Sequence, residues 1–289
     1  MSTTSRIILL DKDPGITSFT ALGEVKKTFG RKVGHAGTLD KFARGLLIVL
    51  TGAMTKLNPL FSSLDKSYRA RIRFGSETDT LDPEGEVVAT AEVPTLDMVL
   101  EAIRGFDGEL LQTPPIYSAL HVGGKRASAL ARKGRPVELE PRPVRIDSFE
   151  ILRYEDGVLE ADLRVSKGTY IRSIARDLGL ASSSRAHLVS LVRTSIGPFA
   201  LSEATGIDKQ NDLTDHYLGR LEQMALATVG DEALFPLANG RYPERYELDK
   251  EGSGYIAFYS ADGVLRALGN KKERRLIAQV NRGGVHEDS

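Results

Sequence analysis

Asp40 is the carboxylate whose position in the sequence is best suited to chemistry. It ends the segment GHAGTLD (34–40), with His35 five residues before it and Lys41 directly after it. The glycines of this segment permit positive φ angles or a close approach of the backbone to a ligand, and a neighbouring cation favours an ionised carboxylate. A catalytic carboxylate is therefore one interpretation of Asp40. A turn cap or a surface ion pair is the alternative, and His35 alone is typical of a core or surface position.

The composition argues against several other kinds of catalytic site. The chain has no cysteine, which excludes disulfides, thiolate chemistry and cysteine-based zinc or iron–sulfur sites. Its five histidines are too scattered for a metal-binding pair at i and i+4. The sequence also contains no GxGxxG after a strand, no Walker loop and no GxSxG. We therefore expect a site without metal or cofactor.

Hydrophobicity and charge predict a globular cytoplasmic protein. Hydrophobic residues make up 41% of the 289 residues, enough for a sizeable core. The longest apolar run (46–50) is too short to span a bilayer, and the first residues lack a secretory signal pattern. The 39 basic and 39 acidic residues balance, so any nucleic-acid partner must be bound by local clusters of cations.

Two basic clusters are candidates for binding phosphates. Arg69, Arg71 and Arg73 alternate along one segment, and we expect at least part of this set to contact phosphates. Ion pairs with acids on neighbouring strands are the alternative interpretation. The second cluster comprises Lys125, Arg126, Arg132, Lys133, Arg135, Arg142 and Arg145.

The elements that must position these residues mix helix and strand without a βαβ rhythm. Residues 34–40 are too rich in glycine for a regular element and predict a loop. Helices are expected from Thr17 or Ser18 to Phe29, and at 54–64, 95–106, 170–180 and 213–227, with a short one before Gly134. Strands are expected at 6–10, 45–50, 67–74, 86–89 and 188–195, with a hairpin of 144–154 and 158–166. This arrangement predicts an α+β fold on a mixed or antiparallel sheet.

A change in composition after Glu203 marks the approach to a distinct C-terminal part. We expect a large catalytic domain at residues 1–228 and a small β-rich unit at 229–289. Short strand candidates in the second unit lie at 255–259 and 276–280. The chain shows no internal repeat and no low-complexity segment.

Six segments in unbroken order resemble the tRNA pseudouridine-55 synthase family (TruB type). They are LLDKDPGITS (9–18), KVGHAGTLDKFARGLL (32–47), KSYRARIRFGSETDTLDPEGEV (66–87), QTPPIYSALHVGGKRASALARKG (112–134), VSKGTYIRSIARDLG (165–179) and LVRTSIGPF (191–199). The resemblance implies a pseudouridine synthase-like catalytic domain that acts as a monomer on the T-arm stem–loop of tRNA. The tail does not clearly match the family's RNA-binding PUA domain, so we expect a reduced or divergent PUA-like unit there.

The resemblance also assigns roles to the chemistry-bearing residues. Asp40 matches the catalytic aspartate, which acts as a nucleophile or as a proton acceptor. His35 matches a histidine that inserts into the RNA loop where the flipped base had been. Tyr68 matches the tyrosine that stacks on the target uracil.

Four further positions complete this set. Tyr170 matches a substrate-contacting tyrosine, and Arg172 matches the arginine that pairs with the catalytic aspartate. Leu191 aligns with an apolar residue that lines the uracil pocket. Lys12 matches a lysine that supports the N-terminal motif, a structural role rather than a catalytic one. The resemblance thus implies isomerisation of uridine to pseudouridine at position 55, after base flipping and without a cofactor.

The chain departs from the family pattern at a few positions around these residues. Pro14 is displaced by one position, Lys41 replaces a proline, Arg44 a threonine and Val192 an arginine. None of these changes removes a group that the chemistry requires, although lost rigidity near Asp40 would affect the rate or the RNA preference. Three other functions stay open at this point: a glycoside hydrolase, an RNA-folding module with dispensable chemistry, and a guide-RNA-dependent relative. A glycoside hydrolase would need two carboxylates flanking the bond.

Overall fold

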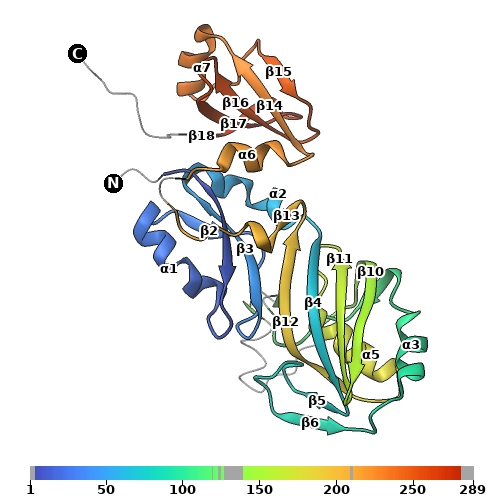
Figure 1. The fold of residues 1–289 in the computed structure, drawn as a ribbon. Coiled ribbons are helices and arrows are strands. Elements are labelled where there is room, and N and C mark those ends of the chain that lie inside the picture. Colours follow the sequence, from blue (N-terminus) through green and yellow to red (C-terminus); the bar gives the residue numbers. More distant parts are fainter. Residues whose placement is uncertain (1–3, 119, 123–124, 127–138, 209–210, 281–289) are drawn as a thin grey trace.

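A computed structural model describes residues 4–118, 120–122, 125–126, 139–208 and 211–280 (Figure 1). Helices are interspersed among runs of strands, and the strands form one large mixed sheet, one smaller C-terminal sheet and two two-stranded sheets. This confirms the α+β class. The short helix expected before Gly134 lies outside the described residues, as does part of the second basic cluster.

The large sheet brings together strands from the whole catalytic part of the chain. Its order is β1 (Ile7–Lys12), β3 (Arg44–Thr51), β12 (Ala186–Ile196), β4 (Lys66–Phe74), β11 (Val158–Val165), β10 (Arg142–Glu155) and β7 (Gly108–Gln112). Two short strands, β2 (Val33–His35) and β13 (Phe199–Ala200), pair with β3 and β12. Only the pairing of β3 with β12 is parallel within this described sheet, so the sheet is mixed, as the sequence predicts.

Strand β4 lies near the middle of this sheet, and its two faces differ sharply. Lys66, Tyr68, Ala70, Ile72 and Phe74 are buried, whereas the three arginines between them are exposed. This is the period-two alternation of a strand covered on one face. The buried residues from Tyr68 onward pack with α5 (Ile171–Ala181) and with neighbouring strands in one core cluster.

The remaining helices and short strands of this part lie outside the large sheet. Thr17 caps α1 (Ser18–Phe29) by accepting a 3.0 Å hydrogen bond from the backbone N–H of Thr20, as its residue type predicts. Helix α1 packs on β1 and β3. The other elements of this part are η1 (Gly52–Leu57), α2 (Asn58–Ser62), β5 (Ser76–Thr78), β6 (Val87–Thr90), α3 (Leu96–Ile103), β8 (His121–Val122), β9 (Lys125–Arg126) and η2 (Leu201–Glu203).

The C-terminal unit is a five-stranded sheet with one short helix, joined to the catalytic part through α6 (Thr214–Gly219) (Figure 1). Its strand order is β15 (Glu247–Lys250), β14 (Met224–Val229), β16 (Tyr255–Ser260), β17 (Leu265–Asn270) and β18 (Arg275–Gln279), and η3 (Asp231–Ala233) and α7 (Leu234–Ala238) complete it. The expected small β-rich unit is confirmed. The division expected after residue 228 falls inside β14, whose hydrogen bonds belong to this sheet, so the sheet already begins at Met224.

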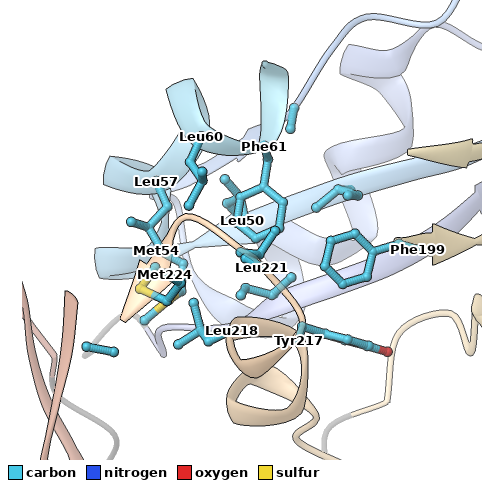
Figure 2. Close-up of a cluster of buried hydrophobic side chains, with 14 of the residues drawn as sticks. Leu50, Met54, Leu57, Leu60, Phe61, Phe199, Tyr217, Leu218, Leu221 and Met224 are labelled. Atoms are coloured by element: carbon cyan, nitrogen blue, oxygen red, sulfur yellow. The ribbon is translucent and has the colours of Figure 1, made fainter. Parts of the chain in front are cut away.

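One apolar cluster joins the two parts of the molecule (Figure 2). The ring of Phe199 lies between Phe61 and Tyr217, with centroid distances of 5.9 and 5.7 Å. Leu218 and Met224 add fully buried side chains beside them. Each large apolar side chain buried in this way contributes about 1.5–3 kcal/mol. The C-terminal unit is thus packed against the catalytic part through a shared core.

Three expectations about local structure were wrong in part. Val33–His35 forms β2 despite its glycine, because the edge of β3 supplies hydrogen-bond partners. The helix expected at 54–64 is a 3₁₀ turn followed by α2. The helix expected at 213–227 ends at Gly219, and the apolar residues that follow form β14, because a short apolar run does not distinguish a helix from a buried strand.

Candidate active site

A cavity of about 530 Å³ opens beside the large sheet, next to the N-terminus of α5. Five of the residues singled out in the sequence line it: Asp40, Tyr68, Tyr170, Arg172 and Leu191. They come from the loop after β2, from β4, from the start of α5 and from β12. Residues up to 151 positions apart in the sequence are thus brought to one site, as the resemblance implies.

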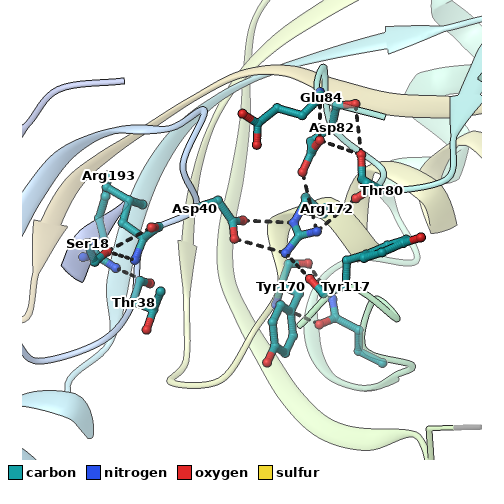
Figure 3. A network of polar contacts seen from close by, with 12 residues as sticks. Ser18, Thr38, Asp40, Thr80, Asp82, Glu84, Tyr117, Tyr170, Arg172 and Arg193 are labelled. Carbon is teal, nitrogen blue, oxygen red and sulfur yellow. Dashed lines mark hydrogen bonds and ion pairs between the residues drawn. The ribbon is translucent and has the colours of Figure 1, made fainter. Parts of the chain in front are cut away.

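Asp40 and Arg172 form a bidentate ion pair in this cavity (Figure 3). The guanidinium donates from Nε to Oδ2 at 2.9 Å and from Nη2 to Oδ1 at 3.1 Å. The Arg172 side chain is only 5% exposed, whereas that of Asp40 is 36% exposed. The carboxylate is therefore held in one orientation and remains open to the cavity.

Arg172 is itself fixed by groups from two further segments (Figure 3). It donates to the backbone carbonyl oxygens of Thr80 and Tyr117, both at 3.0 Å. The buried carboxylate of Asp82 lies 3.6 Å away, and burial raises the pKa of Asp82. Because Asp82 does not line the cavity, it does not supply the second carboxylate that a glycoside hydrolase needs at the bond.

The loop that leads to Asp40 is held by side chains from α1 and β12. The hydroxyl of Ser18 donates to the carbonyl of Leu39 and accepts from its N–H, both at 2.9 Å. Arg193 donates to the carbonyl oxygens of Gly37 at 3.1 Å and Thr38 at 3.3 Å. The loop therefore has a defined backbone even though its sequence is rich in glycine.

Lys12 lies outside the cavity and stabilises the loop that carries Asp40. Its buried ammonium donates to the carbonyl oxygens of Asp13 at 2.9 Å, Ile16 at 2.8 Å and Lys41 at 3.4 Å. Burial, followed by repulsion from Arg193, lowers the pKa of Lys12. These contacts join the N-terminal turn to the residue after the candidate catalytic carboxylate.

The two tyrosines of the cavity are positioned by different means. Tyr68 is 8% exposed and projects from the covered face of β4. Tyr170 directly precedes α5, and the side-chain amide of Gln112 on β7 fixes its backbone. This amide donates to the carbonyl of Tyr170 at 3.2 Å and accepts from its N–H at 2.8 Å. Burial raises the pKa of Tyr170. Leu191, 4% exposed on β12, adds an apolar wall.

His35, like Lys12, is a predicted site residue that does not line the cavity. It lies at the end of β2, in register with Val49 of β3. Burial, followed by repulsion from Arg193, lowers the pKa of His35, so the neutral imidazole is favoured.

In the described part of the chain no group of His, Asp and Glu side chains is arranged to hold a metal ion.

Two cations of the cavity were not singled out in the sequence, Lys66 and Arg193. Lys66 lies two residues before Tyr68 on β4, and Arg193 lies two residues after Leu191 on β12. The two cations therefore project from the same face of their strands as these buried residues. A basic residue at a strand position where the alternation predicts a buried, apolar side chain is the feature that would have identified them. The Lys66 ammonium donates to the carbonyls of Ser62 at 2.7 Å and Leu64 at 2.5 Å.

One of the three arginines on the exposed face of β4 forms an ion pair with a neighbouring strand. Arg69 donates from Nε and Nη2 to the two carboxylate oxygens of Asp162 on β11, both at 2.8 Å. For Arg69, the alternative interpretation of an ion pair to a neighbouring strand is therefore observed. The three arginines project from the face opposite Tyr68 and point away from the cavity.

Comparison with known proteins gives a consistent family match. Residues 26–171 match the model described as TruB family pseudouridylate synthase (N terminal domain). A protein of Borreliella burgdorferi (strain ZS7) named tRNA pseudouridine synthase B is 40% identical over 241 residues, which cover 82% of this chain and 86% of that protein. A protein of the same name from Mycobacterium sp. (strain KMS) is 46% identical over 213 residues, covering 71% and 72% of the two chains.

Solved structures share the fold over almost the whole chain. A chain of an archaeal box H/ACA sRNP Nop10-Cbf5 complex has a TM-score of 0.64 and 22% sequence identity, and the match covers 96% of this chain and 86% of that chain. A chain of a Cbf5-Nop10-Gar1 complex has a TM-score of 0.62 at 25% identity, with 96% and 84% covered. Among the described residues no helix is long and apolar enough to cross a membrane.

Proposed function

The chain belongs to the TruB family of pseudouridylate synthases, and from this premise we propose that it isomerises the uridine at position 55 of the tRNA T-loop, with Asp40 as the catalytic carboxylate. It is a tRNA pseudouridine synthase, an isomerase. The observation that supports the catalytic assignment is the bidentate pair of Asp40 with Arg172, which presents an oriented carboxylate to a cavity lined by Tyr68 and Leu191.

The proposed reaction breaks the bond between the ribose C1′ and the uracil N1 and rejoins the base through C5. C5 loses its proton and N1 gains one, so the product is an isomer and no redox partner is needed. Asp40 attacks C1′ as a nucleophile or accepts a proton during these steps. In either role it must meet the nucleotide in a fixed geometry, which is what the two bonds from Arg172 provide.

The cavity walls suit a base that has been flipped out of the RNA loop. Extruding a base costs a few kcal/mol, and stacking on an aromatic ring is worth about 1–3 kcal/mol. In this proposal Tyr68 supplies the stacking surface, Leu191 packs on the uracil, and Tyr170 contacts the nucleotide. Lys12 stabilises the loop that carries Asp40, through its bond to the carbonyl of Lys41.

We further propose that His35 fills the position that the base vacates in the RNA. It lies on β2, at the start of the loop that ends in Asp40, so RNA that places a nucleotide in the cavity would pass close to it. The partner in this proposal is the T-arm stem–loop of tRNA, and the enzyme acts as a cytoplasmic monomer. Sedimentation of the protein with and without the stem–loop would test the monomer.

The experiment that tests the function compares Asp40→Asn with a matched control, Asp162→Asn. Both changes remove one carboxylate from a bidentate arginine pair, but only Asp40 lines the cavity. Carbodiimide labelling followed by primer extension reports pseudouridine in a T-arm stem–loop. We expect a stop at the target uridine with wild type and with Asp162→Asn, and no stop with Asp40→Asn, which should still bind the RNA.

Three other results would point elsewhere. Equal stops with wild type and Asp40→Asn would assign catalysis to another residue. Tight binding by wild type without a stop would favour an RNA-folding module. A requirement for a guide RNA or partner protein would contradict activity on naked tRNA.

A further inference from the structure

One end of the candidate active-site cavity is formed by two buried cations, Lys66 and Arg193. Lys66 is 7% exposed and Arg193 is 1% exposed, and both line the cavity. They meet at Gly37, in the loop that carries Asp40. A Cβ atom at Gly37 would lie 3.9 Å from Cε of Lys66 and 3.8 Å from Nη1 of Arg193. The absence of a side chain at Gly37 keeps the space beside the two cations open.

These two cations have no carboxylate partner in the described part of the chain. Arg193 donates to the carbonyl oxygens of Leu46, Gly37 and Thr38. Lys66 donates to the carbonyl oxygens of Ser62 and Leu64. The nearby acid Asp65 is engaged by Arg145, whose Nη2 lies 3.0 Å from its Oδ2. The pair therefore brings two positive charges to the cavity that are hydrogen-bonded to backbone carbonyls, and Asp65 acts on Lys66 only through a longer-range attraction that raises its pKa.

Such an arrangement leaves an electrostatic deficit that a ligand can remove. A buried charge is costly unless it is paired as well as hydrogen-bonded. Burial and the neighbouring Arg193 lower the pKa of Lys66 to about 8, and Lys167 adds further repulsion. Lys66 is still mostly protonated at neutral pH, so an anion in the cavity would be attracted by both cations. By contrast, the charge of Asp40 is already matched by Arg172.

We propose that Lys66 binds a backbone phosphate next to the target uridine, with Arg193 as a fixed second cation behind it. The inference rests on the proposed function, because a nucleotide in the cavity brings its flanking phosphates with it. Phosphate is the only anionic group of an RNA nucleotide, whereas uracil and ribose are neutral. The hydroxyl-bearing residue Thr38 also lines the cavity and offers a further donor to the phosphate oxygens. Bound in this way, the phosphate fixes the sugar relative to Asp40.

The test is a double-mutant cycle in which the charge of Lys66, the charge of one phosphate, or both charges are removed. T-arm stem–loops are prepared with a neutral methylphosphonate at one or the other phosphate flanking the target uridine, and binding is measured at pH 7. We expect one of the two substitutions to weaken binding to wild type about tenfold. Lys66→Met should weaken binding of the unmodified RNA to a similar extent and lose nothing more with that methylphosphonate. The slope of log affinity against log salt concentration should become shallower by about 0.7 for the phosphate that Lys66 no longer neutralises.

Two further variants keep the test interpretable. Lys66→Gln retains donors for the carbonyls of Ser62 and Leu64 without the charge, so it should behave as Lys66→Met does even if the latter folds poorly. Arg104→Gln removes an exposed cation that does not line the cavity and should leave the RNA affinities unchanged.

The outcomes separate this inference from the proposed function. Additive losses from Lys66→Gln and each methylphosphonate, with wild type still forming pseudouridine, would overturn the phosphate site alone. Failure of wild type to bind or modify the stem–loop would overturn the proposed function.

Discussion

Two bidentate arginine–carboxylate pairs lie on opposite faces of the large sheet and differ mainly in their surroundings. In the cavity, the side chain of Arg172 is 5% exposed and holds Asp40, while two backbone carbonyls hold the guanidinium. On the outer face, Arg69 and Asp162 join β4 to β11 with side chains that are 50% and 37% exposed. The bond lengths are alike, between 2.8 and 3.1 Å.

The comparison shows that bonding geometry alone does not identify a functional pair. An exposed ion pair is screened by water and salt and is worth about 0–1 kcal/mol. Arg172 is surrounded by acceptors that hold it in one place, and its partner Asp40 lines a cavity. The same two groups therefore strengthen a sheet in one setting and orient a reactive carboxylate in the other.

Replacing each arginine by lysine is expected to give the largest contrast between the two pairs. Arg172→Lys keeps the charge but loses the fork that orients Asp40, and a small misplacement of a reacting group costs about 100-fold or more in rate. Arg69→Lys should leave the rate unchanged. Single-turnover pseudouridine formation with saturating enzyme measures the effect, and equal rates for the two variants would contradict the orienting role of Arg172.

Lys66 extends the comparison to a buried cation without a carboxylate. Because its pKa falls to about 8 on folding, the unfolded chain binds more protons between pH 8 and the usual lysine value of about 10.5. The free energy of unfolding should therefore rise by at most about 3 kcal/mol as the pH increases across this window. Below pH 8 this contribution should not change with pH. Urea denaturation of wild type and Lys66→Met isolates the effect, since other titrating groups cancel in the difference. A difference that does not change with pH would show that Lys66 titrates normally.

Tyr68 lies on the covered face of β4, opposite Arg69, and substitutions of Tyr68 test whether this face binds the RNA base. Tyr68→Leu keeps an apolar side chain but removes the ring, so binding of the T-arm stem–loop should weaken by about 1–3 kcal/mol. Tyr68→Phe keeps the ring and should bind the RNA as wild type does. If Tyr68→Phe loses as much affinity as Tyr68→Leu, the phenol hydroxyl rather than stacking holds the base.

The outer pair should give the smallest effect. Arg69→Gln removes an exposed partner of Asp162, so thermal unfolding should report a loss of less than about 1 kcal/mol that shrinks as salt is added. Pseudouridine formation should not change. A loss of T-arm binding with Arg69→Gln would show that this face also meets RNA, as the sequence first indicated.

The sequence by itself determined much of the local structure and the identity of the candidate residues. The alternation of Tyr68 and Arg69 predicted a strand with one covered face, and the residue type at Thr17 predicted the start of α1. These features depend on neighbours in the chain, so a local pattern is sufficient to show them. The resemblance of six segments added the partnership of Asp40 with Arg172, which lies 132 residues away.

Only the tertiary structure decided what surrounds each charged group. It placed Lys66 and Arg193 at the cavity without a carboxylate partner, paired Arg69 with Asp162 on the outer face, and left His35 out of the cavity lining. It also made a strand of 224–229, because β15 and β16 offer hydrogen bonds on both sides. Burial and pairing arise from segments that meet only in the folded chain, and these contacts determine what a charged residue can do.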